Sequence, residues 1–254
     1  MYCVAAEETK ARLVARGVAA EKVVATGIPV APKFSIRPKS ATVRRAYGLR
    51  DDQPILLVLS GGFGLGPVAN ILSALDQVEG ALQILVVAGR NAALRHELAG
   101  QDRRHPTHVL GFVNNMHELM AVADLIITKP GGLTSSEALA MGKPMMILDP
   151  IPGQETANSD FLLKHGAAAK ANRIEDLPFR LRQLLDSPKL QAMARAAKAL
   201  GHPKSAVHIC RKVIARWENR PHPRHEASNR QAVGETVFDV RHQKKRRRLR
   251  AGGL

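Results

Sequence analysis

Residues 124–158 read DLIITKPGGLTSSEALAMGKPMMILDPIPGQETAN, and this stretch decides the fold. In order, it predicts a strand (124–128), a glycine turn (130–132), a helix (133–141), a second strand (144–148) and a loop that starts another helix near Gln154. Two strand-to-helix turns in succession are typical of a parallel sheet. Such turns all lie at the carboxyl edge of the strands, so we expect a ligand to bind there.

The first of these turns has the features that an anion requires. Gly131 and Gly132 permit positive φ and let a ligand approach the backbone. Thr134 is expected to cap the helix, whose free N–H groups and dipole point to the same place. Glu137, about one helical turn further on, can accept hydrogen bonds from two vicinal hydroxyls. The turn therefore suggests a nucleotide, with phosphate at the glycines and ribose at Glu137.

A simpler interpretation of this turn stays open. Thr-x-x-Glu is also a capping box, in which Glu137 only closes the start of the helix. The second loop favours a binding site, because it places Gln154, Glu155 and Asn158 at the carboxyl end of the next strand. Amide and carboxylate groups in that place can bind sugar hydroxyls. The alternative for these three residues is a helix N-terminus with exposed polar side chains.

The same alternation of strands and helices runs from residue 54 to residue 170. It predicts the α/β class and a doubly wound parallel sheet. The strand at 54–60 is followed by GGFGLG (61–66), which we interpret as a second phosphate-facing turn. No Lys and Ser/Thr pair follows these glycines, so a Walker-type triphosphate site is not expected. A further strand is predicted over 108–113.

Composition divides the chain into three parts. Residues 1–40 read as the remnant of an amino-terminal domain followed by a proline-rich linker. Residues 41–217 form the predicted ligand-binding domain. Residues 218–254 are predicted to be a disordered basic tail that ends in KKRRRLR (244–250), either simply solvated or tethered to anionic lipid. Nucleic-acid binding is not expected, because no aromatic interleaving and no known fold motif accompany these charges.

The overall composition limits the class of protein and of partner. With 254 residues, 45% of them apolar, the chain can bury a real core. The net charge of +16 favours anionic partners. Cys3 and Cys210 are far apart and predict two buried, unpaired thiols and no metal site. No apolar run is long enough to cross a bilayer, so we expect a cytoplasmic protein that is peripheral on the inner face of the membrane.

In combination, these segments resemble the sugar-donor half of GT-B glycosyltransferases. The likeness is greatest to the group that holds monogalactosyldiacylglycerol synthase, the processive diacylglycerol glucosyltransferases and the lipid II N-acetylglucosaminyltransferase. It covers about residues 1–215 and leaves out the basic tail. The motifs that carry it are GIPV (27–30), GGFG (61–64), GFVNNM (111–116), DLIITKPGGLTSSE (124–137) and PGQETAN (152–158).

The resemblance implies an inverting hexosyl transfer from a UDP-hexose or UDP-N-acetylhexosamine to a lipid acceptor such as diacylglycerol, with no metal and no cofactor. In that family the residues that match Gly61, Gly62 and Thr134 face the diphosphate. The residue that matches Glu137 holds the ribose hydroxyls, in agreement with the local chemistry. Gly132 belongs to the same turn.

The resemblance also implies the other contacts to the donor, some of which the local chemistry suggests as well. The segment that matches Phe112 and Val113 offers backbone groups to the uracil, although plain packing at a strand end would also account for it. The pair that matches Gln154 and Glu155 contacts the donor sugar. Asn158 lies in the same motif.

The sequence also departs from the family pattern. Family members often carry an arginine where this chain has Ala31, and Lys33 or Arg37 are the candidates to replace its charge. The amino-terminal domain, with the acceptor site and the general base, is largely missing. His117 and His165 are lone helical histidines, so no base is identified and the chain is expected to be inactive by itself.

Three hypotheses about function follow. The first is the donor-binding part of a lipid-directed glycosyltransferase. The second is the donor-binding subunit of a two-chain enzyme, with a separate acceptor-domain chain as its partner. The third is a non-catalytic protein that binds a UDP-sugar or another anion.

Overall fold

The computed structural model describes residues 1–61, 66–148, 152–185 and 187–219. Residues 1–213 form one compact unit, and residues 214–254 form a second. The predicted basic tail lies almost wholly outside the described residues. The predicted domain boundaries at residues 40 and 217 therefore stay predictions.

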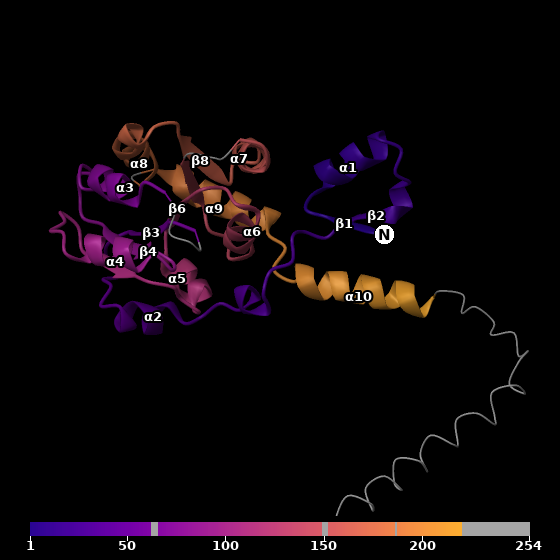
Figure 1. Cartoon of the computed structure of the whole chain (residues 1–254), viewed down its shortest axis with the longest axis horizontal. Coiled ribbons are helices and arrows are strands. Elements are labelled where there is room, and N and C mark those ends of the chain that lie inside the picture. Colours follow the sequence, from indigo (N-terminus) through magenta and orange to yellow (C-terminus); the bar gives the residue numbers. More distant parts are fainter. Residues whose placement is uncertain (62–65, 149–151, 186, 220–254) are drawn as a thin grey trace, which may run out of the picture. The chain divides into compact units, whose positions relative to one another are not determined.

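The centre of the first unit is a parallel six-stranded sheet (Figure 1), which confirms the predicted fold class. The strands lie in the order β5-β4-β3-β6-β7-β8. Their bounds are β3 (Ile55–Leu59), β4 (Gln83–Val87), β5 (Thr107–Leu110), β6 (Leu125–Thr128), β7 (Met145–Leu148) and β8 (Ala168–Ala171).

The strand order reverses in the middle of the sheet. From β3 the chain moves outward through β4 to β5, and it then returns to place β6 against the other side of β3. In that pairing Leu57 lies opposite Ile126 and Val58 lies opposite Ile127. A reversal of this kind opens a crevice at the carboxyl ends of the two central strands, where open α/β sheets bind their ligands.

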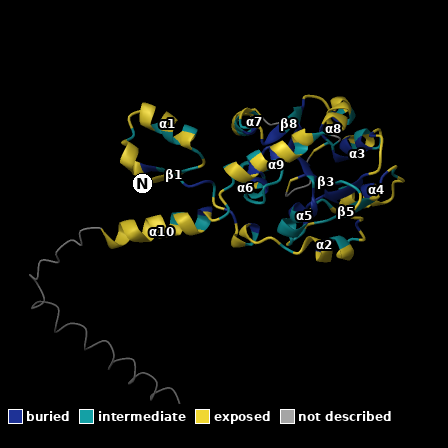
Figure 2. Cartoon of the chain, turned by 180° about the vertical axis from the view of Figure 1, so that it is seen from behind, coloured by how far each residue is buried: buried dark blue, intermediate teal, exposed yellow. Residues whose placement is uncertain are grey.

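Helices cover both faces of the sheet. In β3, Ile55 and Leu57 belong to one buried cluster, and Leu56 and Val58 belong to the other. Successive side chains of a strand point to opposite faces, so a strand without polar residues must be covered on both sides. Figure 2 shows these strands as buried.

The two clusters identify which helices lie on which face. One face is covered by α2 (Ser40–Ala46), α5 (Met116–Val122), α6 (Gly132–Ala140) and α7 (Gln154–Lys164). The other is covered by α3 (Val68–Leu75), α4 (Ala92–Ala99) and α8 (Leu177–Leu185). The helix α9 (Pro188–Leu200) contributes to both clusters, with Ala197 in the first and Met193 in the second.

The remaining elements frame this core. A two-stranded parallel sheet pairs β1 (Tyr2–Val4) with β2 (Val23–Ala25), and between them lie α1 (Glu7–Ala15) and η1 (Ala20–Lys22). The short helices η2 (Pro32–Ser35) and η3 (Ile174–Asp176) and the helix α10 (Ser205–Glu218) complete the described chain.

The two cysteines differ from the prediction. Both Cys3 and Cys210 are free, as expected, but both are exposed, so the prediction that they are buried is wrong. Cys3 lies in β1, where Tyr2 and Cys3 are exposed and Val4 is half-buried.

Candidate functional site

The two strands at the switch point both end in glycine turns. Gly61 lies two residues after the end of β3 and has φ of 78°, a value that residues with a Cβ rarely adopt. The next glycine of that turn, Gly62, lies outside the described residues. After β6, Lys129 and Pro130 lead into Gly131 and α6. The carboxyl edge therefore presents a glycine turn on each side of the crevice.

The start of α6 differs from the prediction in one detail. The helix begins at Gly132, and Gly131 is its N-cap, with φ of −63° and no side-chain cap. Gly131 therefore does not use positive φ, and Thr134 is the third helical residue rather than the cap. A capping box needs Thr at the N-cap and Glu three residues later. That alternative for Glu137 is excluded, because Glu137 lies six residues after the N-cap.

The start of α7 lies against the same turn. Its N-cap is Gly153, with φ of 99°. A Cβ added to Gly132 would lie 3.6 Å from Nε2 of Gln154, and one added to Gly131 would lie 3.8 Å from Oε1 of Glu155. The two loops therefore converge, as the hypothesis of a shared site requires.

Asn158 joins these two loops. Its Nδ2 donates a hydrogen bond of 2.9 Å to the carbonyl oxygen of Pro130, in the turn after β6. This bond connects the second turn of α7 to the segment that leads into α6. A role in direct contact with the donor sugar stays a prediction for Asn158.

Glu137 is the titratable group that the site perturbs most clearly. Burial raises the pKa of its carboxyl above the ordinary value, and the positive charge of Lys33 acts in the opposite direction. Among the described residues, no hydrogen bond to this carboxylate is observed. A half-buried carboxylate without donors of its own is well placed to accept hydroxyl groups of a ligand.

The segment after β5, the edge strand that β4 separates from β3, carries the predicted uracil contacts. The strand ends at Leu110, so the predicted strand to residue 113 is too long and both Phe112 and Val113 lie in the loop. Phe112 is 58% exposed, and the guanidinium carbon of Arg90 lies 5.1 Å from its ring centroid. Packing at a strand end does not explain such an exposed aromatic ring.

Lys33 and Arg37, the two candidates to replace the charge of the family's arginine, have different surroundings in the structure. Nζ of Lys33 donates a hydrogen bond of 2.7 Å to the carbonyl oxygen of Asn114, in the loop that carries Phe112. Lys33 also acts on the pKa of Glu137. Arg37 instead lies near Lys143, in the connection between α6 and β7: burial lowers the pKa of Lys143, and the positive charge of Arg37 acts in the same direction. Only Lys33 lies among the predicted donor contacts.

We expect Lys33→Met to weaken UDP binding about tenfold and to leave uridine binding nearly unchanged, because a hydrogen bond to a charged group contributes about 1.5–3 kcal/mol. Isothermal titration calorimetry with both ligands measures the difference. Arg37→Met is the matched control and should bind both ligands like the wild type. An equal loss for UDP and uridine would show that Lys33 does not contact phosphate.

The structure also reveals a histidine–carboxylate pair that sequence reasoning missed. Nε2 of His165 lies 2.7 Å from Oε1 of Glu8, 157 residues away in the sequence. The bond to His165 is the main reason that the pKa of Glu8 is lowered. His165 follows the last residue of α7, and an 11-residue helix is about 16 Å long. The pair therefore lies too far from Gln154 to serve as the general base.

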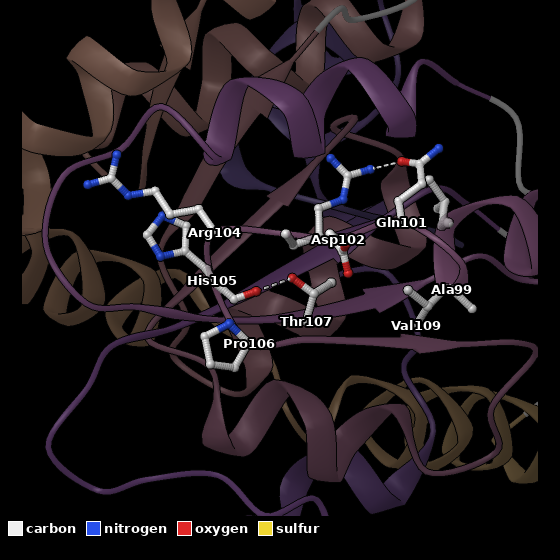
Figure 3. Close-up of a pocket in the computed structure, with 10 residues that line it drawn as sticks. Ala99, Gln101, Asp102, Arg104, His105, Pro106, Thr107 and Val109 are labelled. Carbon is white, nitrogen blue, oxygen red and sulfur yellow. Dashed lines mark hydrogen bonds between the residues drawn. The ribbon is translucent and has the colours of Figure 1, made fainter.

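A hollow lies at the amino-terminal edge of the sheet, opposite the carboxyl edge that carries the glycine turns. It has a volume of about 490 Å³ and is lined by the residues that lead into β5 (Figure 3). In its wall Arg103 forms an ion pair of 2.9 Å with Asp76, and Nε2 of His105 lies 3.1 Å from the carbonyl oxygen of Val78. These contacts attach the α4–β5 connection to the end of α3. Because ligands of open α/β sheets bind at the carboxyl edge, we assign this hollow a structural role.

Two further observations concern the whole described part of the chain. Within it, no group of three or more His, Cys, Asp or Glu side chains is arranged to hold a metal ion. None of its helices is both long and apolar enough to cross a membrane.

Comparison with solved structures defines the class to which this fold belongs. MurG of Acinetobacter baumannii superposes with a TM-score of 0.58 at 25% identity, over 72% of this chain and 55% of MurG. A UDP complex of MnaA from S. aureus superposes with a TM-score of 0.65 at 17% identity, over 85% of this chain and 61% of MnaA. The fold is that of the Rossmann-like C-terminal domain of GT-B glycosyltransferases.

The sequence comparisons identify the family. Residues 58–209 match the glycosyltransferase family 28 C-terminal domain. The processive diacylglycerol beta-glucosyltransferase of Bacillus pumilus is 37% identical over 217 residues, which are 84% of this chain and 56% of that protein. Its counterpart in Bacillus cereus is 36% identical over 88% of this chain and 58% of that protein. The chain belongs to glycosyltransferase family 28, and it spans a little more than half the length of these relatives.

Proposed function

We propose that this chain binds the UDP-sugar in an inverting hexosyl transfer to a lipid acceptor. The observation that carries the proposal is the convergence of the α6 and α7 N-termini at the switch point, with the half-buried carboxylate of Glu137 beside them. The names of the curated relatives, which are diacylglycerol glucosyltransferases, support a lipid acceptor.

Each part of the site has a role in this proposal. The turn after β3 and the N-terminus of α6 face the diphosphate, since the first turn of a helix leaves backbone N–H groups unpaired. Glu137 accepts the ribose hydroxyls, and the loop with Phe112 and Val113 receives the uracil. Gln154 and Glu155 contact the hexose or N-acetylhexosamine.

The chemistry is a displacement at the anomeric carbon. The acceptor oxygen forms a bond to that carbon while the bond to the UDP oxygen breaks, and the electron pair leaves with the diphosphate. Backbone N–H groups and the α6 dipole stabilise the charge that develops on the leaving group. The acceptor proton goes to a general base that lies outside the described site, so we propose that the chain is inactive by itself.

The location of the reaction is part of the proposal. A lipid acceptor places the enzyme at a membrane surface, and the net charge of +16 suits an anionic inner face. We propose that the basic segment 244–250 contributes to that attraction as a peripheral tether.

Calorimetry with two anionic ligands tests the proposal. We expect the chain to bind UDP with little loss of affinity between about 50 and 200 mM salt, because the site makes few phosphate contacts. Duplex DNA, bound by many phosphate contacts, should lose affinity about a thousandfold or more over that range. Tight DNA binding without any binding of UDP would contradict a role as a glycosyl-donor domain.

A further inference from the structure

The turn after β4 supplies none of the predicted donor contacts, which follow β3, β5, β6 and β7. It nevertheless lies between two of them. The strands are arranged in the order β5-β4-β3, and Leu59, Val87 and Leu110 pair across these three strands. Neighbouring strands are about 4.8 Å apart, so the ends of β3 and β5 are about 10 Å apart. A nucleotide with its base at the β5 loop and its diphosphate at the β3 turn therefore lies across the turn that carries Gly89 and Arg90.

Arg90 contacts the exposed aromatic ring of the loop after β5. Its guanidinium carbon lies over the Phe112 ring, 5.1 Å from the centroid. A cation and an aromatic face attract each other within about 6 Å. Among the described residues, no carboxylate pairs with Arg90. The ring of Phe112 is therefore the partner of this charge in the described part of the chain.

The contact leaves much of the Phe112 ring accessible. Phe112 is 58% exposed even though the guanidinium lies over one of its faces, so the opposite face is open to solvent. A nucleic-acid base stacks readily on an aromatic face, because every base has a flat π-surface of its own. The loop after β5 therefore offers a flat surface for a base in addition to its backbone groups.

Two cations from different parts of the chain hold this loop. Lys33 binds its backbone through the hydrogen bond of 2.7 Å to the carbonyl oxygen of Asn114, and Arg90 lies against its ring. A cation over one face of a ring limits the rotation of that ring. A ring that is already fixed binds a flat ligand with a smaller loss of conformational entropy than a mobile ring does.

We propose that Arg90 is a positioning residue of the donor site: its guanidinium holds the Phe112 ring as a platform on which the uracil stacks. The inference rests on the proposed function, in which the loop after β5 receives the base. It adds a side-chain contact to the backbone groups that are implied for this loop. Arg90 itself lies outside every motif that carries the family resemblance.

UDP binding by four forms of the complete chain tests this role, with calorimetry as the measurement and circular dichroism as the check of the fold. Arg90→Met removes the charge and should weaken UDP binding about three- to fivefold. Arg90→Lys keeps a cation but loses the planar group, so its affinity should lie between those of wild type and Arg90→Met.

Arg95→Met is the matched control for the loss of a cation beside this loop. A Cβ added to Gly111 would lie 3.5 Å from Cδ of Arg95, so Arg95 approaches the same loop at Gly111. Arg95 is exposed, as Arg90 is. Arg95→Met should bind UDP like the wild type.

A double-mutant cycle shows whether Arg90 acts through Phe112. Phe112→Leu removes the platform and should weaken UDP binding about tenfold, which corresponds to the loss of one stacked base. In the Phe112→Leu background, Arg90→Met should cause no further loss, because the guanidinium has no ring to hold.

Contrary results would overturn the proposal in different ways. Equal UDP affinity in Arg90→Met and wild type would show that the pair is a surface contact without a role in binding. An equal loss from Arg90→Met with and without the Phe112 ring would show that Arg90 contacts the nucleotide directly. Equal losses in Arg90→Lys and Arg90→Met would exclude the attraction between cation and ring. Failure of the wild type to bind UDP would instead contradict the proposed function.

Discussion

Glu137→Ala is expected to weaken UDP binding about 10- to 100-fold, with the fold intact. Each hydrogen bond to a charged group contributes about 1.5–3 kcal/mol, and every 1.4 kcal/mol changes a dissociation constant about tenfold. The structure excludes the capping role for Glu137, because α6 begins at Gly132 and its N-cap is Gly131. Loss of affinity is therefore not expected to come from an unravelled helix.

Calorimetry with UDP measures the loss of affinity, and circular dichroism measures whether the fold is intact. Glu97→Ala, which removes an exposed carboxylate from α4, is the control and should bind UDP like the wild type. An unchanged dissociation constant in a folded Glu137→Ala variant would remove the ribose contact from the proposed site.

The raised pKa of Glu137 adds a pH dependence to the same prediction. Its ordinary value is 4.5, and burial raises the pKa in the folded chain. Between these two values the folded state binds more protons than the unfolded state, so the contribution of this residue to stability falls as pH rises through that window. Glu137→Gln should therefore stabilise the free chain at neutral pH. Uridine affinity should fall in wild type as pH drops through the raised pKa, because only the carboxylate accepts both hydroxyls.

Gly201→Ala is expected to lower the free energy of unfolding by about 2–3 kcal/mol or more, as overpacking of a closed contact does. Gly201 follows α9 and has φ of −70°, a value that alanine adopts freely. The cost comes from space, since an added Cβ would lie 2.2 Å from the carbonyl oxygen of Leu139 in α6. Backbone atoms cannot give way as a flexible side chain can, so α9 must shift away from α6.

Gly100→Ala is the matched control for this prediction. Gly100 also follows a helix, α4, and has φ of −88°, but the only nearby atom would lie 3.9 Å from the added Cβ. Alanine should be neutral or slightly stabilising there, by up to about 1 kcal/mol. Urea unfolding of both variants measures the difference, and equal midpoints would show that α6 and α9 are not in close contact at Gly201.

The fold was largely predictable, because its signals are local and repeated. Each buried strand is a short apolar run, each is followed by a turn with glycine or asparagine, and the helices between them keep the spacing of a parallel sheet. The predicted strands and helices agree with the structure apart from a few residues at their ends. The glycine turns and the polar start of α7 follow the carboxyl ends of their strands, as predicted, whereas their role in binding stays a prediction.

The errors share a physical cause. Thr134 was predicted to cap α6 because its side chain can do so, but the backbone geometry of Gly131 places the N-cap three residues earlier. The exposed cysteines show the same limit, since Cys3 is apolar enough to be buried but lies in a sheet of only two strands. The chemistry of a side chain limits the contacts that it can form, and the tertiary structure determines which of these contacts are made.

The sequence by itself determined the class of fold, the family and the position of the glycine turns at the carboxyl edge of the sheet, because periodicity and turn residues act over a few positions of the chain. Tertiary structure decided the rest: the bond from Glu8 to His165, the bond from Lys33 to Asn114, and the difference between Gly201 and Gly100. Each of these depends on atoms brought together from distant parts of the chain. The residues next to each of these positions in the sequence do not indicate which distant atoms it contacts.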